Sequence, residues 1–153
     1  MSIGFSQMHH IGIVVPDLDG AMSELSTQLG LTWAPIRHSE RTVRHLGRLV
    51  TTDLRLTYSI EGPPHLELIG EARGTPWEPT GGGIHHAGFW VPDLRGTGLE
   101  LARAGMTLEA TYDAEDGGLL GFAYFTDPNG FRVEILDDAR RKSFDDWLAG
   151  GPG

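Results

Sequence analysis

An internal repeat constrains this chain more than any other feature of its sequence. Residues 9–25 read HHIGIVVPDLDGAMSEL and residues 85–101 read HHAGFWVPDLRGTGLEL, with ten identities in seventeen positions and no gap. The segments that close the two copies also match, because PHLELIG at 64–70 resembles FRVEILD at 131–137. Such a duplication predicts two copies of one supersecondary unit that bury a common core.

Hydrophobic alternation and the helix-capping residues predict the same order of elements in each copy. The fold class we expect is α+β, with two tandem βαβββ modules that form a cupped mixed sheet. The predicted strands cover 8–15, 31–37, 46–60 (with a turn near Thr52–Asp53), 65–70, 84–91, 106–112, 120–126 and 131–136, and the predicted helices cover 19–29 and 94–104. The DPNG segment at 127–130 predicts a tight turn between the last two strands.

The same pattern divides the chain into segments of one structural domain. The first module is expected at 1–70, a Gly- and Pro-rich linker at 71–83, the second module at 84–136 and a polar tail at 137–153. Within the tail, Phe144, Trp147 and Leu148 form an apolar stripe that could dock on the modules.

Composition narrows the function classes. The chain has 153 residues, no cysteine and a formal net charge of −9. The negative charge argues against a nucleic-acid partner, and no run of about 18 apolar residues predicts a membrane span. The start of the sequence also lacks the pattern of a signal peptide. We therefore expect a cytoplasmic protein with a small-molecule partner, in which any metal site uses His and carboxylate ligands.

Strand alternation places four chemically active residues on one face of the predicted sheet. Successive side chains of a strand point to opposite faces, and the apolar partners of these four residues face the helices. A Glu within an apolar strand is costly to bury unless it is paired or coordinated. The face opposite the helices therefore carries two symmetry-related His/Glu pairs, which are His10, Glu67, His86 and Glu134.

These four residues predict a site for one divalent metal ion. Two imidazoles and two carboxylates suit Ni, Co, Mn, Fe or Zn without selecting among them, and leave two of six octahedral positions open. A lone His or Glu on a strand is more often structural, but four at matched places in a repeat favour ligation. His9 and His85 are expected to point toward the helix side and to have a structural role.

Residues that break the symmetry of the repeat are candidates for substrate binding. His65 precedes Glu67 by two positions, where Arg132 precedes Glu134, and Trp90 matches Val14. Arg132 could hold a carboxylate or phosphate, and an ordinary ion pair at the surface is the alternative. Trp90 offers a flat apolar wall.

The motifs HHIGIVVPDLDGAM, ELIG, HHAGFWVPDL and FTDPNGFRVEIL resemble the vicinal-oxygen-chelate superfamily, which includes glyoxalase I, epimerases, extradiol dioxygenases and bleomycin-binding proteins. The resemblance covers residues 8–137. It implies paired βαβββ modules around a metal ion, with pairing within one chain or across a homodimer. The His, Glu, His, Glu set looks like that of bacterial-type glyoxalase I, whereas the family's dioxygenases have His at the position of Glu67.

The resemblance implies a reaction class but no particular substrate. Glyoxalase I carries Arg and Asn where this chain has Val14 and Glu71, so a glutathione-dependent reaction is not expected. We expect a glyoxalase-like isomerase, epimerase or lyase that acts through a metal-chelated enediolate on a substrate with adjacent oxygens. Glu67 or Glu134 would be the catalytic base. The alternatives are a ring-cleaving dioxygenase and a protein that sequesters a small molecule.

Overall fold

The computed structural model describes residues 3–151 and contains two βαβββ units, as predicted. The first unit comprises β1 (His10–Val15), α1 (Leu18–Leu29), β2 (Arg37–His45), β3 (Arg48–Tyr58) and β4 (His65–Gly70). The second comprises β5 (His86–Val91), α2 (Leu94–Arg103), β6 (Thr107–Tyr112), β7 (Phe122–Thr126) and β8 (Arg132–Asp137). Short 3-10 helices lie at Phe5–Gln7 (η1) and Asp138–Arg140 (η2), and α3 (Arg141–Leu148) ends the described part.

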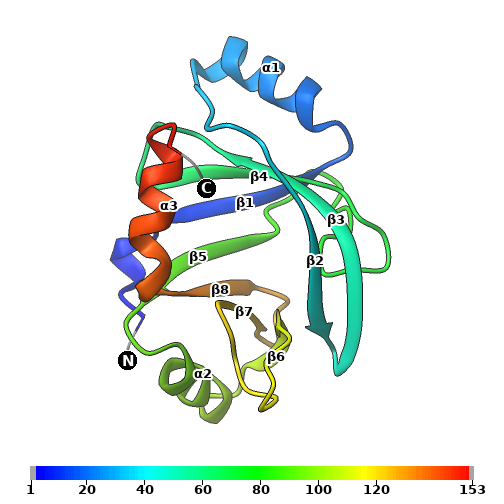
Figure 1. The fold of residues 1–153 in the computed structure, drawn as a ribbon, viewed down its shortest axis with the longest axis vertical. Helices are drawn as coiled ribbons and strands as arrows, with labels where there is room; N and C mark the ends of the chain where they lie inside the picture. The colour runs from blue at the N-terminus through cyan, green and yellow to red at the C-terminus, as the bar shows by residue number, and fades with distance from the viewer. Residues whose placement is uncertain (1–2, 152–153) are drawn as a thin grey trace.

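All eight strands form one closed circuit, in the order β1-β4-β3-β2-β6-β7-β8-β5 (Figure 1). Each module contributes one parallel pair, β1 with β4 and β5 with β8. The modules join where β1 runs antiparallel to β5 and where β2 runs antiparallel to β6. A single chain therefore encloses the space between the two modules.

The helix boundaries follow from matched capping residues. The Asp17 side chain accepts a hydrogen bond from the Gly20 N–H at the start of α1, and the Asp93 side chain accepts one from the Gly96 N–H at the start of α2. Such side-chain caps satisfy backbone donors that have no partner within the first helical turn. The PDL tripeptide of the repeat thus sets where each helix begins.

The strand predicted at 46–60 corresponds to β3, but the strand predicted at 31–37 and the turn predicted near Thr52–Asp53 are wrong. Residues 31–36 hold only an isolated bridge from Trp33 to Ser59, and the strand predicted there begins instead at Arg37. The hairpin turn lies at Leu46 and Gly47, whose φ angles are 50° and 81°, and not near Thr52–Asp53. Two successive positive φ angles are typical of a type I′ hairpin, so Gly47 was the turn signal in this segment.

The DPNG turn is confirmed, but Phe131 next to it does not enter the core as the strand pattern predicts. The Asp127 N–H donates to the Phe131 carbonyl, and the Gly130 N–H donates to the Asp127 carbonyl. Strand β8 begins only at Arg132, and Phe131 is 44% exposed because it still belongs to the turn.

The C-terminal segment covers part of the barrel. Phe144 and Trp147 of α3 are buried in the larger core cluster, and Leu148 packs against that cluster. In Figure 1, α3 lies beside one end of β1, β4 and β5. The predicted apolar stripe therefore does dock on the modules. No helix in the described part of the chain is long and apolar enough to cross a membrane.

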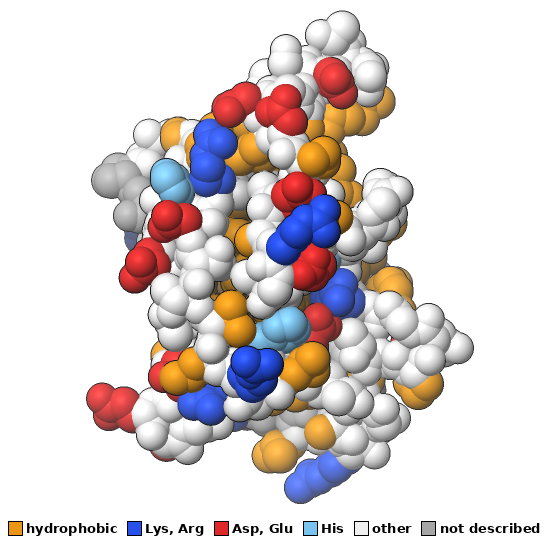
Figure 2. All heavy atoms as spheres, turned by 90° about the vertical axis from the view of Figure 1, so that its right-hand side faces the viewer, with side chains coloured by type: hydrophobic (Ala, Val, Ile, Leu, Met, Phe, Trp, Pro, Cys, Tyr) orange, Lys and Arg blue, Asp and Glu red, His pale blue; other side chains and the backbone are white. Residues whose placement is uncertain are grey.

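The surface that Figure 2 shows carries charged side chains of both signs. Helix α1 protrudes at the top of the molecule in Figures 1 and 2. On the face that Figure 2 shows, acidic and basic side chains lie next to one another with apolar side chains among them. Charges of both signs are thus interspersed on this surface although the chain is acidic.

Candidate metal centre

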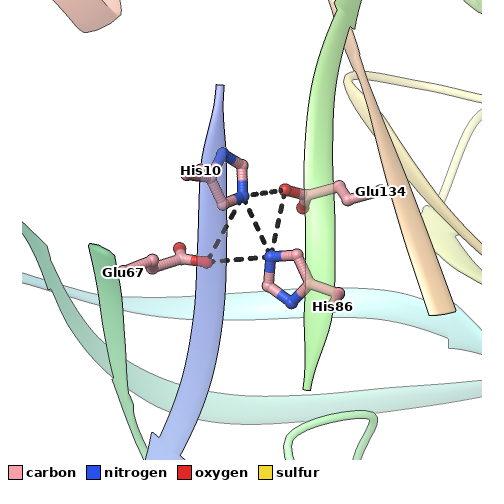
Figure 3. A group of neighbouring side chains, drawn as sticks. All are labelled: His10, Glu67, His86 and Glu134. Atoms are coloured by element: carbon pink, nitrogen blue, oxygen red, sulfur yellow. Dashed lines mark hydrogen bonds and ion pairs between the residues drawn. The ribbon is translucent and has the colours of Figure 1, made fainter. Parts of the chain in front are cut away.

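The four residues that strand alternation selects meet inside the barrel. His10, Glu67, His86 and Glu134 come from β1, β4, β5 and β8, and their side chains point toward one another (Figure 3). All four are buried, and one donor atom of each lies within 4.8 Å of the others. The four side chains could therefore hold a single divalent metal ion.

The distances among the donor atoms suit a shared ion. The two Nε2 atoms of His10 and His86 lie 2.9 Å apart. The Glu134 Oε1 lies 2.9 Å from the His10 Nε2, and the Glu67 Oε1 lies 3.1 Å from the His86 Nε2. Ligands about 2.1 Å from a metal ion are separated by roughly 3.0–3.4 Å in octahedral or tetrahedral geometry.

The carboxylates give a second indication of a cation. Glu67 Oε1 and Glu134 Oε1 are buried and have no hydrogen-bond partner among the described residues. They lie at ion-pair distance from the imidazoles, but the contacts do not have hydrogen-bond geometry. Unsatisfied buried carboxylate oxygens are costly, and a divalent ion between them would remove that cost.

A glycine in each module makes room for the histidine of the other module. In the β1–β5 pairing, Gly12 lies opposite His86 and Gly88 lies opposite His10. A Cβ atom at Gly12 would lie 2.2 Å from the His86 ring, and one at Gly88 would lie 1.9 Å from the His10 ring. The HH-x-G spacing of the repeat thus has a steric cause. The spacing is visible in the sequence, but its cause requires the pairing of β1 with β5.

The prediction that His9 and His85 point toward the helix side is wrong. Both rings contact a candidate metal ligand. The His9 Nδ1 lies 2.9 Å from the His10 Nδ1, and the His85 Nδ1 lies 2.9 Å from the His86 Nδ1. Each therefore hydrogen-bonds the ring nitrogen of a candidate ligand that faces away from the centre. Partners of this kind orient metal-binding imidazoles.

The His85 pair fixes the tautomer of His86. Burial, followed by the charge of His86, lowers the pKa of His85 to about 4, so its ring is neutral at neutral pH. Its Nε2 lies 2.7 Å from the Pro76 carbonyl oxygen, which can only accept, so this nitrogen carries the proton. The His85 Nδ1 must then accept from the His86 Nδ1, which leaves the His86 Nε2 as the coordinating nitrogen.

Without a metal ion, the surroundings favour a protonated His86 and an ionised Glu134. Burial lowers the pKa of His86, but the charges of Glu134 and Glu67 beside it outweigh burial and raise the pKa to about 9. Burial raises the pKa of Glu134, but the charges of His86 and His10 beside it hold the pKa below its usual range. The protein thus balances the buried charges against one another, as it would balance them against a cation.

Two tyrosines flank the carboxylates symmetrically. Tyr58 is paired with Glu67 across β3 and β4, and Tyr124 with Glu134 across β7 and β8. Burial and the two glutamates raise the pKa of both phenols well above 10.0. Both therefore remain protonated, and the Tyr124 hydroxyl accepts a hydrogen bond from the Trp77 Nε1 at 3.0 Å.

The centre opens into a cavity of about 310 Å³. Its wall includes Glu67 and Glu134 together with many aromatic side chains. Trp90 lines it, as does Trp77 from the segment predicted as a linker. The aromatic lining residues are Tyr58, Trp77, Trp90, Tyr112, Phe122, Tyr124 and Phe144.

Two of the three predicted substrate-binding residues lie outside the wall of this cavity. Arg132 forms a two-pronged ion pair with Glu109, at 2.7 and 3.0 Å, and donates to the His85 carbonyl. The buried His65 places its Nδ1 2.8 Å from the Ser59 carbonyl oxygen and packs against His9. The alternative for Arg132, a residue paired with a carboxylate, is the one that the structure shows.

The cavity instead contains three arginines that the sequence pattern did not single out, Arg37, Arg41 and Arg140. Arg37 and Arg41 are four residues apart on β2, so they share a face. That alternation was visible in the sequence, but a strand predicted to end at residue 37 hid it.

Comparison with known proteins identifies the family. A model of the glyoxalase/bleomycin resistance protein/dioxygenase superfamily matches residues 9–125. The chain therefore belongs to this superfamily, also called the vicinal-oxygen-chelate superfamily.

Solved structures agree on the fold. Methylmalonyl-CoA epimerase from Mycobacterium tuberculosis matches with a TM-score of 0.63 and 17% identity, over 94% of this chain and 93% of that one. A single-residue variant of Streptomyces coelicolor methylmalonyl-CoA epimerase, in complex with 2-nitronate-propionyl-CoA, matches with a TM-score of 0.59 and 16% identity, over 87% of this chain and 97% of that one.

Proposed function

We propose that this protein is a metal-dependent enzyme that moves a proton at a carbon next to a carbonyl group, in a small substrate with two adjacent oxygens. The observation that carries the proposal is the buried His10, Glu67, His86 and Glu134 set, in which one oxygen of each carboxylate lacks a hydrogen-bond partner among the described residues and both glutamates line a substrate-sized cavity. The class is isomerase, epimerase or lyase, without a requirement for glutathione.

Each group then has a defined role. A divalent ion held by the four residues supplies a Lewis acid that polarises the carbonyl and makes the neighbouring carbon more acidic. Glu67 or Glu134 accepts the α-proton and returns it to the same or the adjacent carbon. The repeat leaves both carboxylates equivalent in kind, and both line the cavity, so either side of the substrate can face a base.

The surroundings of the carboxylates favour proton transfer over hydrolysis. The aromatic side chains on the cavity wall lower the local polarity beside the carboxylates, which strengthens electrostatic interactions there. Tyr58 and Tyr124 have pKa values that keep them protonated beside the two glutamates, and they can donate hydrogen bonds to substrate oxygens. Trp90 provides a flat surface along one side of the substrate.

Solvent exchange tests the proposal directly. The protein is loaded with Ni, Co, Mn, Fe or Zn and incubated in deuterium oxide with a panel of small α-hydroxy carbonyl compounds, with and without oxygen. We expect deuterium at the α-carbon of recovered substrate without oxygen consumption. Glu67→Gln and Glu134→Gln should each lose the exchange, and added metal should rescue only the variant that retains the base.

The controls separate this function from its alternatives. Glu40→Gln changes an exposed glutamate of β2 and should leave exchange intact. Oxygen uptake in step with product, with no exchange into recovered substrate, would assign a ring-cleaving dioxygenase instead. Tight binding of the panel without turnover would assign a sequestering protein.

We also propose a cytoplasmic location and a homodimer. Both metal-site halves lie in one chain, so a dimer would not be needed to complete the centre. Light scattering after size-exclusion chromatography measures the mass in solution and decides between the monomer and the dimer.

A further inference from the structure

Three guanidinium groups converge on the cavity that holds the candidate metal centre. Arg37 and Arg41 lie on the inner face of β2, which continues to the buried Val43, and Arg140 lies at the end of η2. Arg37 and Arg41 are half-buried, whereas Arg140 is exposed. The three come from two segments far apart in the sequence, so the fold and not the local sequence brings them together.

None of these three arginines forms an ion pair with a carboxylate within residues 3–151. The acidic chain pairs several of its other arginines, among them Arg44 with Asp113 and Arg95 with Asp116. Carboxylates are therefore plentiful on this protein and are kept away from the three cavity arginines.

Aromatic rings hold the cavity arginines instead. The Arg37 guanidinium carbon lies 3.9 Å from the centre of the Trp147 ring. Those of Arg41 and Arg140 lie 5.9 and 5.6 Å from the centre of the Tyr112 ring, and Arg41 also donates to the Tyr112 hydroxyl and to Ser39 Oγ. Stacking positions a guanidinium group but uses few of its five N–H donors.

The arrangement has an electrostatic cost. Burial, followed by the charge of Arg41 and also that of Arg140, lowers the pKa of Arg37. Glu67 and Glu134 in the same cavity would be neutralised by a divalent ion, so with metal bound the charge of the three arginines stays uncompensated. A group of like charges around one cavity is stabilised when an anion binds among them.

We propose that the substrate carries an oxyanion, a carboxylate or a phosphate, which Arg37, Arg41 and Arg140 bind while its two adjacent oxygens reach the four-residue centre. This inference rests on the proposed function and adds the substrate class. Between the two ends, the aromatic and aliphatic wall fits a flat or apolar segment, to which Leu54, Leu56 and Phe122 contribute.

Hydroxamates test this inference because they carry two adjacent oxygens and do not turn over. The protein is loaded with Co(II), and its visible spectrum reports occupation of the centre. Benzohydroxamate, which carries only the chelating group, is the reference probe, and the 3- and 4-carboxy and 4-phosphono derivatives, which add a further anionic group, are the anionic probes. We expect at least one anionic probe to bind about tenfold more tightly than benzohydroxamate, and the difference to shrink as salt is added.

The arginine variants assign the preference to its residues. Arg41→Gln and Arg140→Gln should each reduce the ratio of the dissociation constants of benzohydroxamate and the anionic probe severalfold. The double variant should reduce the ratio further than either single variant, and it leaves Arg37 on Trp147 in case that stacking is needed for folding. Arg44→Gln is the matched control, since Arg44 lies on the opposite face of β2 and pairs with Asp113.

Each outcome is decisive. Anionic probes that all bind no more tightly than benzohydroxamate, or a preference that is undiminished in the double variant, would overturn the inference while leaving the metal centre in place. Failure of benzohydroxamate itself to change the Co(II) spectrum would overturn the chelation of adjacent oxygens, and the inference with it. The relative affinities of the carboxy and phosphono probes identify which oxyanion the site prefers.

Discussion

The two modules share a sequence pattern but differ in how their helices pack. Helix α2 buries four residues against the second module, Leu94, Thr97, Gly98 and Leu101, whereas α1 buries only Leu18. In Figure 1, α1 stands above the barrel, while α2 lies close beneath β8. Under the helices, Ala87 and Phe89 of β5 are buried, but the matching Ile11 and Ile13 of β1 are only half-buried.

A single position of the repeat explains much of this difference. Gly98 of α2 lies so close to the second module that a Cβ there would be 2.4 Å from Leu119 Cδ1. The matching position of α1 is Met22, whose side chain prevents such an approach. Helix α1 is held instead by the Trp33 Nε1, which donates to the Met22 carbonyl.

The outer histidine of the second module also has more hydrogen-bond partners than that of the first module. His85 is held between His86 and the Pro76 carbonyl, whereas His9 bonds His10 with no second protein acceptor among residues 3–151. The second module is therefore the more closely packed half in its core, and its outer histidine has the larger number of hydrogen-bond partners. The comparison teaches that an equal division of the ligands does not require equal packing.

The largest expected effect tests whether the ligands are equally divided. His10→Ala and His86→Ala should each lower the affinity for a divalent ion by more than about 100-fold, since loss of an outer partner alone costs about 10–100-fold. Isothermal titration calorimetry with Ni or Zn measures this. Full retention of metal in the His10→Ala/His86→Ala double variant would contradict the centre altogether.

The next largest effect should be a difference between the modules in how much a core truncation lowers the free energy of unfolding. Leu101→Ala should lower the free energy of unfolding by about 2–5 kcal/mol, because Leu101 is 3% exposed and its cavity cannot fill easily. Leu25→Ala at the matching position of α1 should cost about 1 kcal/mol, because Leu25 is half-buried. Urea denaturation monitored by circular dichroism gives both values, and equal losses would contradict the difference in packing.

How much of this comparison could be predicted depends on the regularity of each segment. Alternation placed His10, His86 and Trp90 correctly because β1 and β5 are regular from their first residue. It misplaced His9 and His85 because each precedes its strand, where the alternation of faces does not hold. The looser packing of α1 could not be predicted from the sequence. The two helices share the same apolar periodicity, but α2 packs closely against its module and α1 does not.

The outer histidines should differ in a third measurement. His85→Phe keeps a ring but removes both of its hydrogen bonds, and we expect a loss of metal affinity of about 10–100-fold because the tautomer of His86 is no longer fixed. His9→Phe removes one bond and should lose less than about tenfold. Competition with a chromogenic chelator measures both, and a larger loss in His9→Phe would reverse the ranking of the modules.

The last effect we expect is a dependence of stability on pH. Burial is the main cause that lowers the pKa of His9 to about 3 and of His85 to about 4, from 6.5. Below pH 6.5 the unfolded chain therefore binds more protons than the folded one, so stability is present above pH 6.5 and declines as the pH falls. Denaturation of metal-free protein between about pH 6.5 and 4.5 should show a shallower decline in His9→Phe and in His85→Phe than in the unmodified protein.

The reciprocal glycines of β1 and β5 have a consequence for how this protein could have evolved. The glycine of each module leaves room for the histidine of the other module. A bulkier residue at Gly12 would therefore displace the His86 ring, and one at Gly88 would displace the His10 ring. After the duplication, drift at either glycine was therefore constrained by a residue of the other copy, not by its own neighbours in the sequence. At these two glycines the copies could not diverge independently of each other, whereas their helices could.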